Sequence, residues 1–452
     1  MVSGSRSTAL DLLNQVTFDD AYANLAMPKI LKNSNLNQRD KTFSQELAFG
    51  TLRHQLTYDA IIDEVSTRKS MEMDAKLLNC LRLGCHQILQ MRVPDHAAIS
   101  ETVELVRKNC GEKVVGFANG VLRSISRKSL TEWLSTLQSK TDAESYRALL
   151  YSHPQWIVSA YRTALEVDGL ASDLDQLLDI NNTPAAVNLV ALPGLAQRPD
   201  ETETLKWNRH SPYGFSISGG NPTELTGFDS GLIRVQDEGS QLAALALCEY
   251  RDPKSGEDWL DMCAGPGGKS AILASISRSN NVNFEANEPI AHRAGLVSSA
   301  LEPIGKFRVR QRNGSEYGKV DENKYDRVLV DAPCTGLGAL RRRPEARWRK
   351  RDKDLKELCK LQYELLESAI AALKPDGLCL YVTCSPHVSE TTAIIHKAMQ
   401  NLDIEVLDLT EFMNSRYFQG KLPSNRKTVQ LFTHRDGTDS MFLALLTKPS
   451  RQ

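Results

Sequence analysis

The sequence lacks the features that would place it in several common classes of protein. No apolar run approaches the roughly 18 residues that cross a membrane, and no basic segment followed by an apolar stretch opens the chain, as a secretory signal would. Acidic and basic residues nearly cancel, with 55 Lys and Arg against 56 Asp and Glu. A uniformly basic nucleic-acid binder is therefore excluded, and any such surface must be a local patch. We expect a soluble, cytoplasmic protein that does not enter a membrane.

Cysteine patterning argues against two further classes. The nine cysteines, an odd number, show no disulfide framework, which is typical of a reducing cytosol. No Cys-x2-Cys pair occurs, and the Cys-x4-Cys pairs Cys80/Cys85 and Cys379/Cys384 have no accompanying histidine cluster. We therefore predict no metal site. Nothing in the pattern requires more than a monomer.

The 452 residues fall into three regions of different periodicity. Residues 1–138 repeat apolar side chains at spacings of three, four and seven, which predicts an all-helical domain. Residues 139–230 are rich in proline and short apolar runs, and predict a small middle α/β module. In residues 231–452 strand-like runs alternate with helical patterns, which predicts a doubly wound parallel α/β sheet. Its seven predicted strands are 259–263, 283–286, 307–311, 327–330, 378–383, 404–407 and 441–446.

A glycine-rich turn follows the first of these strands. Its residues are Cys263, Ala264, Gly265, Pro266, Gly267, Gly268 and Lys269. Glycine lets a backbone approach a ligand closely at the carboxyl end of a strand, where open α/β sheets bind ligands, and the following helix offers free N–H groups. The turn has neither the GxGxxG nor the P-loop spacing. Glu288 follows the second strand, where an acid can accept both hydroxyls of a ribose. Turn and acid together predict a site for an adenosine-containing cofactor.

Two cysteines follow neighbouring strands of the predicted sheet. Cys334 ends the segment Asp331-Ala332-Pro333-Cys334, and Cys384 is central in Thr383-Cys384-Ser385. Adjacent strands lie about 4.8 Å apart, so both thiols should open onto the crevice beside the glycine-rich turn. A single cysteine at a strand end is most often a small buried hydrophobe. Two at equivalent ends, one of them after Asp-x-Pro, indicate chemistry.

A basic run begins seven residues after Cys334. Seven of the eleven residues from Arg341 to Arg351 are Arg or Lys. A charge run is often a solvated face, but this position beside the predicted crevice favours phosphate binding. Trp348 within the run is suited either to stacking on a base or to packing. The predicted RNA-binding residues are Arg341, Arg342, Arg347 and Arg349.

Together these segments resemble the hallmark motifs of the RNA cytosine-5 methyltransferase family, in the family's order. The glycine-rich turn, the segment ending at Cys334 and the segment around Cys384 match three motifs, and the basic run resembles an Arg-rich stretch of the family. The N-terminal helices, with the segment 116–123, resemble a NusB-type RNA-binding domain. The order of domains is similar to that of bacterial enzymes that methylate 16S ribosomal RNA. The resemblance implies a Rossmann-like class I methyltransferase fold, S-adenosylmethionine as cofactor and 16S ribosomal RNA as partner.

The resemblance also implies a role for each site residue. The cofactor would be bound by residues 263–269, Glu288, Asp331 and Asn313, the last standing where the family usually has Asp. A thiolate adding to carbon 6 of cytosine would let carbon 5 take the methyl group, with Asp331 hydrogen-bonded to ring N3. Position alone leaves open which thiol attacks. The resemblance implies Cys384 as nucleophile and Cys334 as the residue that assists proton removal and release.

Three other functions are weighed against this one. The same chemistry on a transfer RNA or 23S ribosomal RNA needs the same motifs. A non-catalytic RNA-binding or assembly protein would keep the fold, but the presence of both Cys334 and Cys384 argues against it. A nucleotide-dependent dehydrogenase is disfavoured by the missing GxGxxG.

Overall fold

The computed structural model describes residues 4–219, 222–423 and 425–450, which form two compact units. Unit 1 comprises Met1–Ser159, Leu178–Pro184 and Leu340–Lys350. Unit 2 comprises Ala160–Leu177, Ala185–Ala339 and Arg351–Gln452. Residues 139–230, which the sequence marked as a middle module, are thus shared between the two units. The short segment 340–350 belongs to unit 1 although the chain on both sides of it belongs to unit 2.

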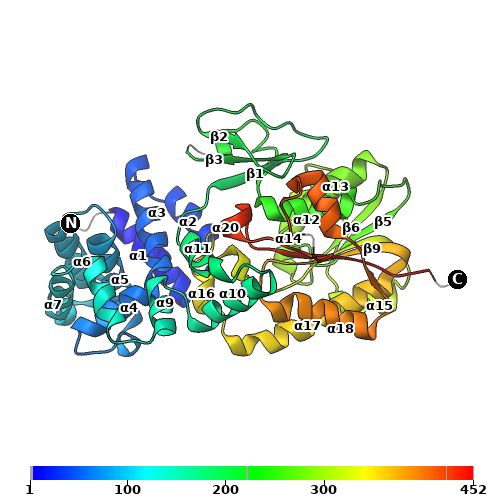
Figure 1. Ribbon diagram of the computed structural model, residues 1–452. Coiled ribbons are helices and arrows are strands. Elements are labelled where there is room, and N and C mark those ends of the chain that lie inside the picture. The colour runs from blue at the N-terminus through cyan, green and yellow to red at the C-terminus, as the bar shows by residue number, and fades with distance from the viewer. Residues whose placement is uncertain (1–3, 220–221, 424, 451–452) are drawn as a thin grey trace. The chain divides into compact units, whose positions relative to one another are not determined.

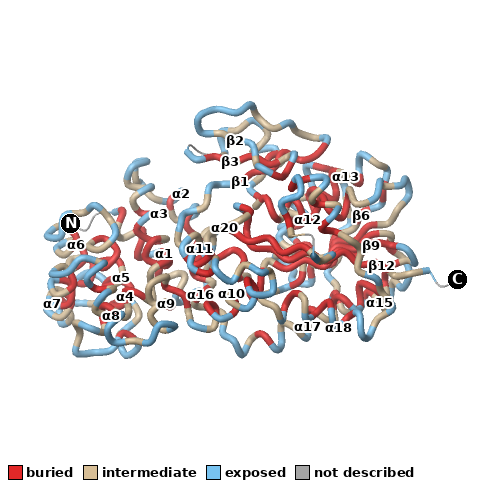
Figure 2. The backbone as a smooth tube through the Cα atoms, in the orientation of Figure 1, coloured by how far each residue is buried: buried red, intermediate tan, exposed pale blue. Residues whose placement is uncertain are grey.

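Unit 1 is built from helices (Figure 1). The apolar positions that predicted the first helix, including Ala9, Leu10 and Leu13, are almost completely buried, and Figure 2 shows such buried stretches in α1, α3 and α5. Polar residues begin several helices, as at Ser129, whose side chain and Glu132 form a capping box. The helices are α1 (Gly4–Phe18), α2 (Ala23–Lys32), α3 (Gln38–Arg53), α4 (Gln55–Val65), α5 (Ala75–Leu89), α6 (Asp95–Cys110), α7 (Val115–Ile125), α8 (Leu130–Gln138), α9 (Ala143–Leu150) and the short α16 (Ala346–Arg349).

Two helices run from one unit into the other. α10 (Gln155–Val167) begins in unit 1, and α11 (Leu174–Ile180) ends there. A small antiparallel sheet of unit 2 follows them, with the strand order β2-β3-β1-β4. Its strands are β1 (Val187–Ala191), β2 (Leu205–Trp207), β3 (Gly214–Ile217) and β4 (Ile233–Val235). Leu189, Phe215 and Ile233 form a separate small core on this sheet.

The large sheet of unit 2 contains all seven predicted strands. Its order is β10-β12-β9-β8-β5-β6-β7, and the short strand β11 also pairs with β12. The five strands from β9 to β7 are parallel, which confirms the doubly wound, Rossmann-like α/β fold. The strands are β5 (Asp258–Asp261), β6 (Asn283–Asn287), β7 (Arg308–Arg310), β8 (Tyr325–Asp331), β9 (Leu373–Thr383), β10 (Glu405–Val406), β11 (Val429–Gln430) and β12 (Phe442–Thr447).

One feature of the predicted sheet requires correction, because the sheet is mixed and not wholly parallel. β12 runs antiparallel to β9, and β10 and β11 run antiparallel to β12. The chain after β10 returns to the carboxyl end of β9, so β12 begins with Phe442 opposite Thr383. Parallel neighbours need a crossover that brings the chain back to the other end of the sheet, and this last connection does not make one.

Helices cover both faces of the large sheet (Figure 1). Successive residues of β9 point to opposite faces: Leu380 lies in a core with α12, α13 and α14, and Tyr381 lies in a core with α17 and α18. The helices on the two faces are α12 (Glu238–Glu249), α13 (Gly268–Ser279), α14 (Ala291–Leu301), α15 (Tyr317–Val320), α17 (Leu355–Ala372) and α18 (Thr392–Asn401). The short helices α19 (Leu409–Met413) and α20 (Thr433–Asp436) follow them in the sequence. The loops at the carboxyl ends of the parallel strands are thereby held by two packed cores.

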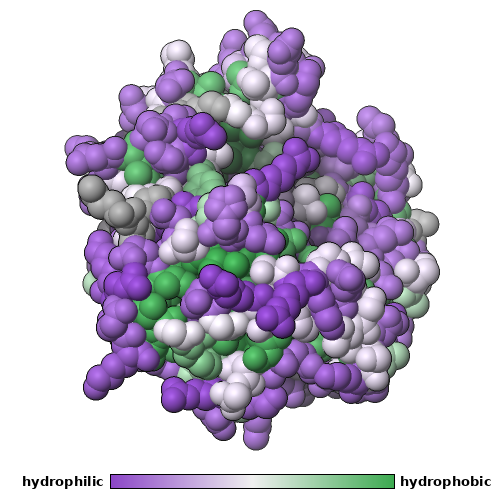
Figure 3. Space-filling model, turned by 90° about the vertical axis from the view of Figure 1, so that its left-hand side faces the viewer, coloured by the Kyte–Doolittle hydropathy of each residue, from purple (hydrophilic) through white to green (hydrophobic). Residues whose placement is uncertain are grey.

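The face in Figure 3 shows hydrophilic side chains over most of its area, with smaller patches of hydrophobic side chains among them. Along the described ranges, no helix combines the length and the apolar character that crossing a membrane requires.

Candidate active site

The structure brings the two predicted cysteine segments together at the carboxyl ends of β8 and β9. These strands are parallel neighbours in which Asp331 lies opposite Val382. The Gly338 N–H donates to the Cys384 carbonyl oxygen over 2.9 Å, and both Cys334 and Cys384 are partly exposed. The prediction that the two thiols share one end of the sheet therefore agrees with the structure.

A buried glutamate joins the loops that carry the two cysteines. Glu390 is fully buried, and its Oε1 accepts hydrogen bonds from the Thr335 backbone N–H over 2.8 Å and from Gln362 Nε2 over 3.0 Å. Its Oε2 accepts from the Thr335 hydroxyl over 2.5 Å and from the Ser385 hydroxyl over 2.6 Å. Thr335 follows Cys334 and Ser385 follows Cys384, so one carboxylate fixes both loops. The sequence analysis did not predict a role for Glu390. The only sequence feature that could have indicated one is the presence of an acidic residue six positions after Cys384.

The two thiols have different charged neighbours. Burial raises the pKa of Cys334 to about 12, and the Glu390 and Asp331 carboxylates act in the same direction. Cys384 interacts instead with the Lys269 ammonium group, and a nearby cation favours the thiolate form of a cysteine. At neutral pH Cys334 is therefore a thiol, while Cys384 has a cation as its charged neighbour.

Lys269 connects the glycine-rich turn to the cysteine loops. Its Nζ lies 2.8 Å from Asp331 Oδ2 in a mostly buried ion pair. Burial acts to lower the pKa of Lys269, but the attraction and hydrogen bond of Asp331, with smaller effects of Cys384 and Asp261, together outweigh it and leave the pKa above its ordinary value. The ammonium group therefore stays charged beside both Asp331 and Cys384.

The glycine-rich turn packs directly against the carboxyl end of β6. α13 begins at Gly268, and Gly267 has a left-handed φ of 108°. A Cβ atom on Gly265 would lie 2.2 Å from Glu288 Oε2, so a larger residue there would force the Glu288 carboxylate to move. The Gly265 carbonyl also accepts from Arg293 over 2.9 Å. The turn and Glu288 thus lie together, as a cofactor site on this turn needs.

Two acidic residues lie at the carboxyl ends of β5 and β6. Glu288 is buried, and its Oε1 accepts the Ile290 N–H over 3.0 Å. Asp261, which sequence reasoning did not single out, accepts from the Ser270 hydroxyl over 2.6 Å, and burial raises its pKa to about 7. Its other oxygen is buried and has no hydrogen-bond partner within the described residues. An unpartnered acceptor beside a glycine-rich turn fits a site that receives a cofactor with donor groups.

The remaining predicted cofactor residues lie near this turn or at its margin. The Ala264 N–H donates to the Asn287 carbonyl over 2.9 Å, which ties the turn to β6. Burial raises the pKa of the Cys263 thiol well above its usual range, so Cys263 is not a competing nucleophile. Asn313 is exposed after β7, and its side chain accepts the Ser315 N–H over 3.2 Å. A cofactor contact by Asn313 stays a prediction.

The basic run differs from what its charge pattern predicted. Arg347 is fully buried in unit 1. Its guanidinium donates to the backbone carbonyls of Arg53, Ser152 and Asn181 over 2.8–3.1 Å and to Asn182 Oδ1 over 2.7 Å. A guanidinium with these acceptors inside the protein is not available to an RNA phosphate, so Arg347 holds the fold of unit 1.

The neighbours of Arg347 contact unit 1 as well. Trp348 Nε1 donates to the Leu52 carbonyl over 3.2 Å, and Arg349 donates to the Ala21 carbonyl. The sequence left open whether Trp348 stacks on a base or packs in the protein. Its N–H is bound to the protein backbone, which favours packing. Phosphate binding stays a prediction for Arg341, Arg342 and Arg349, which are partly exposed.

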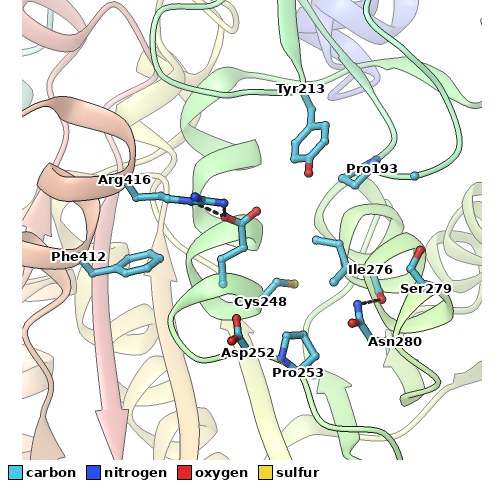
Figure 4. A pocket seen from close by; sticks show the side chains of 12 residues that line it. Pro193, Tyr213, Cys248, Asp252, Pro253, Ile276, Ser279, Asn280, Phe412 and Arg416 are labelled. Carbon is cyan, nitrogen blue, oxygen red and sulfur yellow. Dashed lines mark hydrogen bonds and ion pairs between the residues drawn. The ribbon is translucent and has the colours of Figure 1, made fainter.

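A separate cavity of about 510 Å³ lies in unit 2 (Figure 4). Tyr213 and Pro193 stand on one side of it, and Asp252 and Pro253 on the other. Arg416 pairs there with the Glu249 carboxylate over 2.9 Å. None of the predicted site residues lines this cavity. The candidate active site is therefore the end of the sheet that carries the cysteines.

Comparisons with known proteins agree with this reading of the fold. Residues 249–447 match the family model described as 16S rRNA methyltransferase RsmB/F, and residues 3–127 match the NusB family. A Mycobacterium tuberculosis (strain H37Rv) protein, with methyltransferase but no substrate in its name, is 39% identical over 98% of this chain and 96% of its own length. The ribosomal RNA small subunit methyltransferase B of Enterobacter sp. (strain 638) is 30% identical over 84% of this chain and 86% of its own.

Solved structures share the fold. The crystal structure of PH0851 has a TM-score of 0.81 and 21% identity, covering 99% of this chain and 100% of that one. A methyltransferase homolog from Pyrococcus horikoshii has a TM-score of 0.54 and 22% identity, covering 68% and 99%. A Rossmann-like sheet with a glycine-rich turn, preceded by a NusB-like helical domain, defines an RNA-directed class of methyltransferase. Within that class, the chain belongs to the 16S rRNA methyltransferase RsmB/F family.

Proposed function

We propose that this protein transfers a methyl group from S-adenosylmethionine to carbon 5 of a cytosine in 16S ribosomal RNA, through a covalent adduct with Cys384. Family membership and the name of the Enterobacter relative support a small-subunit RNA as substrate. One observation carries the cytosine chemistry: two cysteine loops share one end of the sheet, are joined by Glu390, and have thiols with different charged neighbours.

Carbon 5 of cytosine is a poor nucleophile until a thiolate has added to carbon 6. The Cys384 sulfur forms that bond, which breaks the aromaticity of the ring and makes carbon 5 electron-rich. The Lys269 ammonium group favours the thiolate. We assign to Asp331, which pairs with Lys269, the hydrogen bond to ring N3; a proton passed from this pair to N3 would stabilise the charge that develops. A paired base cannot reach these groups, so the target must be single-stranded or flipped.

The glycine-rich turn and Glu288 would hold S-adenosylmethionine, which when bound would supply the methyl group for carbon 5. The carbon 5 proton must then leave so that the bond to Cys384 can break. Cys334 suits this later step. Its pKa of about 12 keeps it a thiol that does not compete in the attack. It takes the carbon 5 proton after passing its own proton to a neighbouring carboxylate, such as Asp331.

The assignment is tested by two variants with opposite failures. Cys384→Ser should form no adduct and transfer essentially no methyl group, because a neutral hydroxyl is a far weaker nucleophile than a thiolate. Cys334→Ala should attack and transfer the methyl group, then stall with RNA bound through Cys384. A denaturing gel with labelled cofactor and small-subunit RNA separates the two, and Cys110→Ala, which removes a partly exposed cysteine of unit 1, is the matched control.

Two results would contradict the proposal. A stable adduct from Cys384→Ser, and none from Cys334→Ala, would reverse the roles of the cysteines. Transfer of label to transfer RNA or 23S RNA in preference to 16S RNA would keep the chemistry and change the substrate. Mapping the labelled base then tests the carbon 5 position directly.

A further inference from the structure

A second cavity, which the proposed reaction does not use, lies within unit 1. It measures about 320 Å³ and is lined by residues of α1, α3, α4 and α5 and by the segment Leu340–Lys350. This size is at the lower end of small-molecule sites. The walls that matter for its chemistry are Leu52, Gln55, Glu345, Trp348 and Arg349.

Glu345 gives the cavity an unused hydrogen-bond acceptor. Its side chain is 1% exposed, and its Oε1 accepts the Ala23 N–H over 3.1 Å. Its Oε2 is buried and has no hydrogen-bond partner in the part of the chain that the structure describes. Burial raises the pKa of Glu345. A buried carboxylate oxygen without a donor is unfavourable, so a guest with an N–H group would complete this site.

Arg349 gives the same cavity an unused donor. Its terminal nitrogen donates to the Ala21 carbonyl, while its Nε is buried and has no partner among the described residues. Arg349 interacts electrostatically with Glu345, so the two groups lie near each other. Trp348 and Leu52 add an aromatic and an apolar wall. A fitting guest is therefore flat, and carries N–H donors beside an acceptor.

Among the RNA bases this description favours guanine. Its N1–H and N2 amino groups are donors for a carboxylate, and its O6 and N7 are acceptors that arginine commonly contacts. Adenine has an amino group but no carbonyl oxygen, and uracil has a single ring N–H beside its carbonyls. A protein arginine side chain offers only donors, which leaves the Arg349 N–H without an acceptor and adds a third guanidinium group to a cavity already lined by Arg82 and Arg349.

We propose that this cavity binds an unpaired guanine of the substrate RNA, with Glu345 and Arg349 contacting its edge and Trp348 lying against its ring. The proposal rests on the proposed function for the source of the base. It makes unit 1 a reader of one nucleotide, and not only a general RNA-binding surface. The base that it holds is distinct from the cytosine that reacts with Cys384.

Binding of nucleoside monophosphates to the full chain tests this proposal. Calorimetric titration with GMP, AMP, CMP and UMP is made in excess S-adenosylhomocysteine, which blocks the adenosine site on the glycine-rich turn. We expect GMP to bind at least tenfold more tightly than the other three. Glu345→Gln presents an amide N–H in place of the free oxygen and should lower GMP affinity at least tenfold. Glu72→Gln, at an exposed acid of unit 1, should leave it unchanged.

A second variant covers the case in which Glu345→Gln does not fold. Val16→Trp fills the cavity from α1 without altering Glu345, and should also abolish the GMP preference. Equal affinity for the four nucleotides, unchanged GMP binding in both variants, or tighter binding of N-acetylarginine amide than of GMP would overturn the proposal. The last result would indicate a protein partner.

Methyl transfer by the wild-type chain distinguishes this inference from the proposed function. Methyl transfer to 16S RNA without any GMP preference would contradict the proposed guanine site and support the proposed enzyme activity. GMP preference without methyl transfer to any RNA supports the site and contradicts the enzyme.

Discussion

Replacing Glu390 by glutamine should slow methyl transfer while leaving cofactor binding intact. Glutamine keeps the shape of the side chain, and its Oε1 can still accept from the Thr335 N–H and from Gln362. At the other position an amide N–H replaces the oxygen that accepts from the hydroxyls of Thr335 and Ser385. The two cysteine loops would then be joined by neutral hydrogen bonds, and the two bonds to the hydroxyls of Thr335 and Ser385 must reverse their direction.

The size of the effect follows from these bonds. Hydrogen bonds to a charged group contribute about 1.5–3 kcal/mol, and neutral ones about 0.5–1.5 kcal/mol. Loss of charge assistance at the two hydroxyls therefore costs about 1–3 kcal/mol. If this displaces the loops of Cys334 and Cys384 in the transition state, the rate falls roughly 10- to 100-fold. Glu390→Ala removes all four buried bonds and should cost more.

A second readout separates positioning from simple destabilisation. The Glu390 carboxylate raises the pKa of Cys334, so Glu390→Gln should shift the alkylation profile of Cys334 toward lower pH. The assays are single-turnover methyl transfer, calorimetry with S-adenosylhomocysteine, and mass spectrometry of iodoacetamide-treated protein between pH 7 and 10. Glu367→Gln, at an exposed acid of α17, is the matched control. Wild-type turnover together with an unshifted alkylation profile would refute the role given to Glu390.

Three further predictions concern stability and cofactor binding. Gly265→Ala places a Cβ atom against Glu288 Oε2 and should weaken S-adenosylhomocysteine binding at least tenfold by calorimetry; unchanged affinity would contradict the close approach. Arg347→Met leaves buried carbonyls without donors and should lower the urea stability of unit 1 by about 3 kcal/mol or more, whereas exposed Arg351→Met should not. Burial lowers the pKa of His54 to about 3 and that of His153 well below its ordinary value, so their stabilising contribution is full above about pH 6.5 and is lost as pH falls toward 3, by at most about 1.4 kcal/mol per pH unit for each histidine. His54→Gln should flatten the dependence of the urea midpoint on pH, and an equally steep profile would count against this titration.

The strands of the large sheet could be predicted because each is an apolar or alternating run between turn signals, and all seven are present. The direction of β12 could not, because direction depends on where the preceding connection ends in space. The meeting of Cys334 and Cys384 was predictable from topology, since both follow strands of the same parallel pair. The hydrogen bonds of Glu390 were not, because Thr335 lies 55 residues away in the chain.

The basic run shows the limit of charge patterning most clearly. Seven positive charges in eleven residues indicate an exposed surface for phosphate, and nothing in that pattern marks one arginine as buried. Arg347 is buried because backbone carbonyls from three separate parts of unit 1 converge on its guanidinium. Such convergence is a property of the folded backbone, and a local sequence pattern does not carry it.

The membership of residues 340–350 in unit 1 also has a consequence for the order of synthesis. A ribosome that adds 5–20 residues per second needs roughly 10–30 s to pass from Pro184 to Lys350. During that time the nascent helices have all of their chain except the piece that supplies Arg347, and the carbonyls of Arg53, Ser152 and Asn181 lack their donor. The helical unit is thus finished only after the first strands of the large sheet have been made. A fragment that stops before residue 340, however well chosen by sequence, represents this unfinished nascent state.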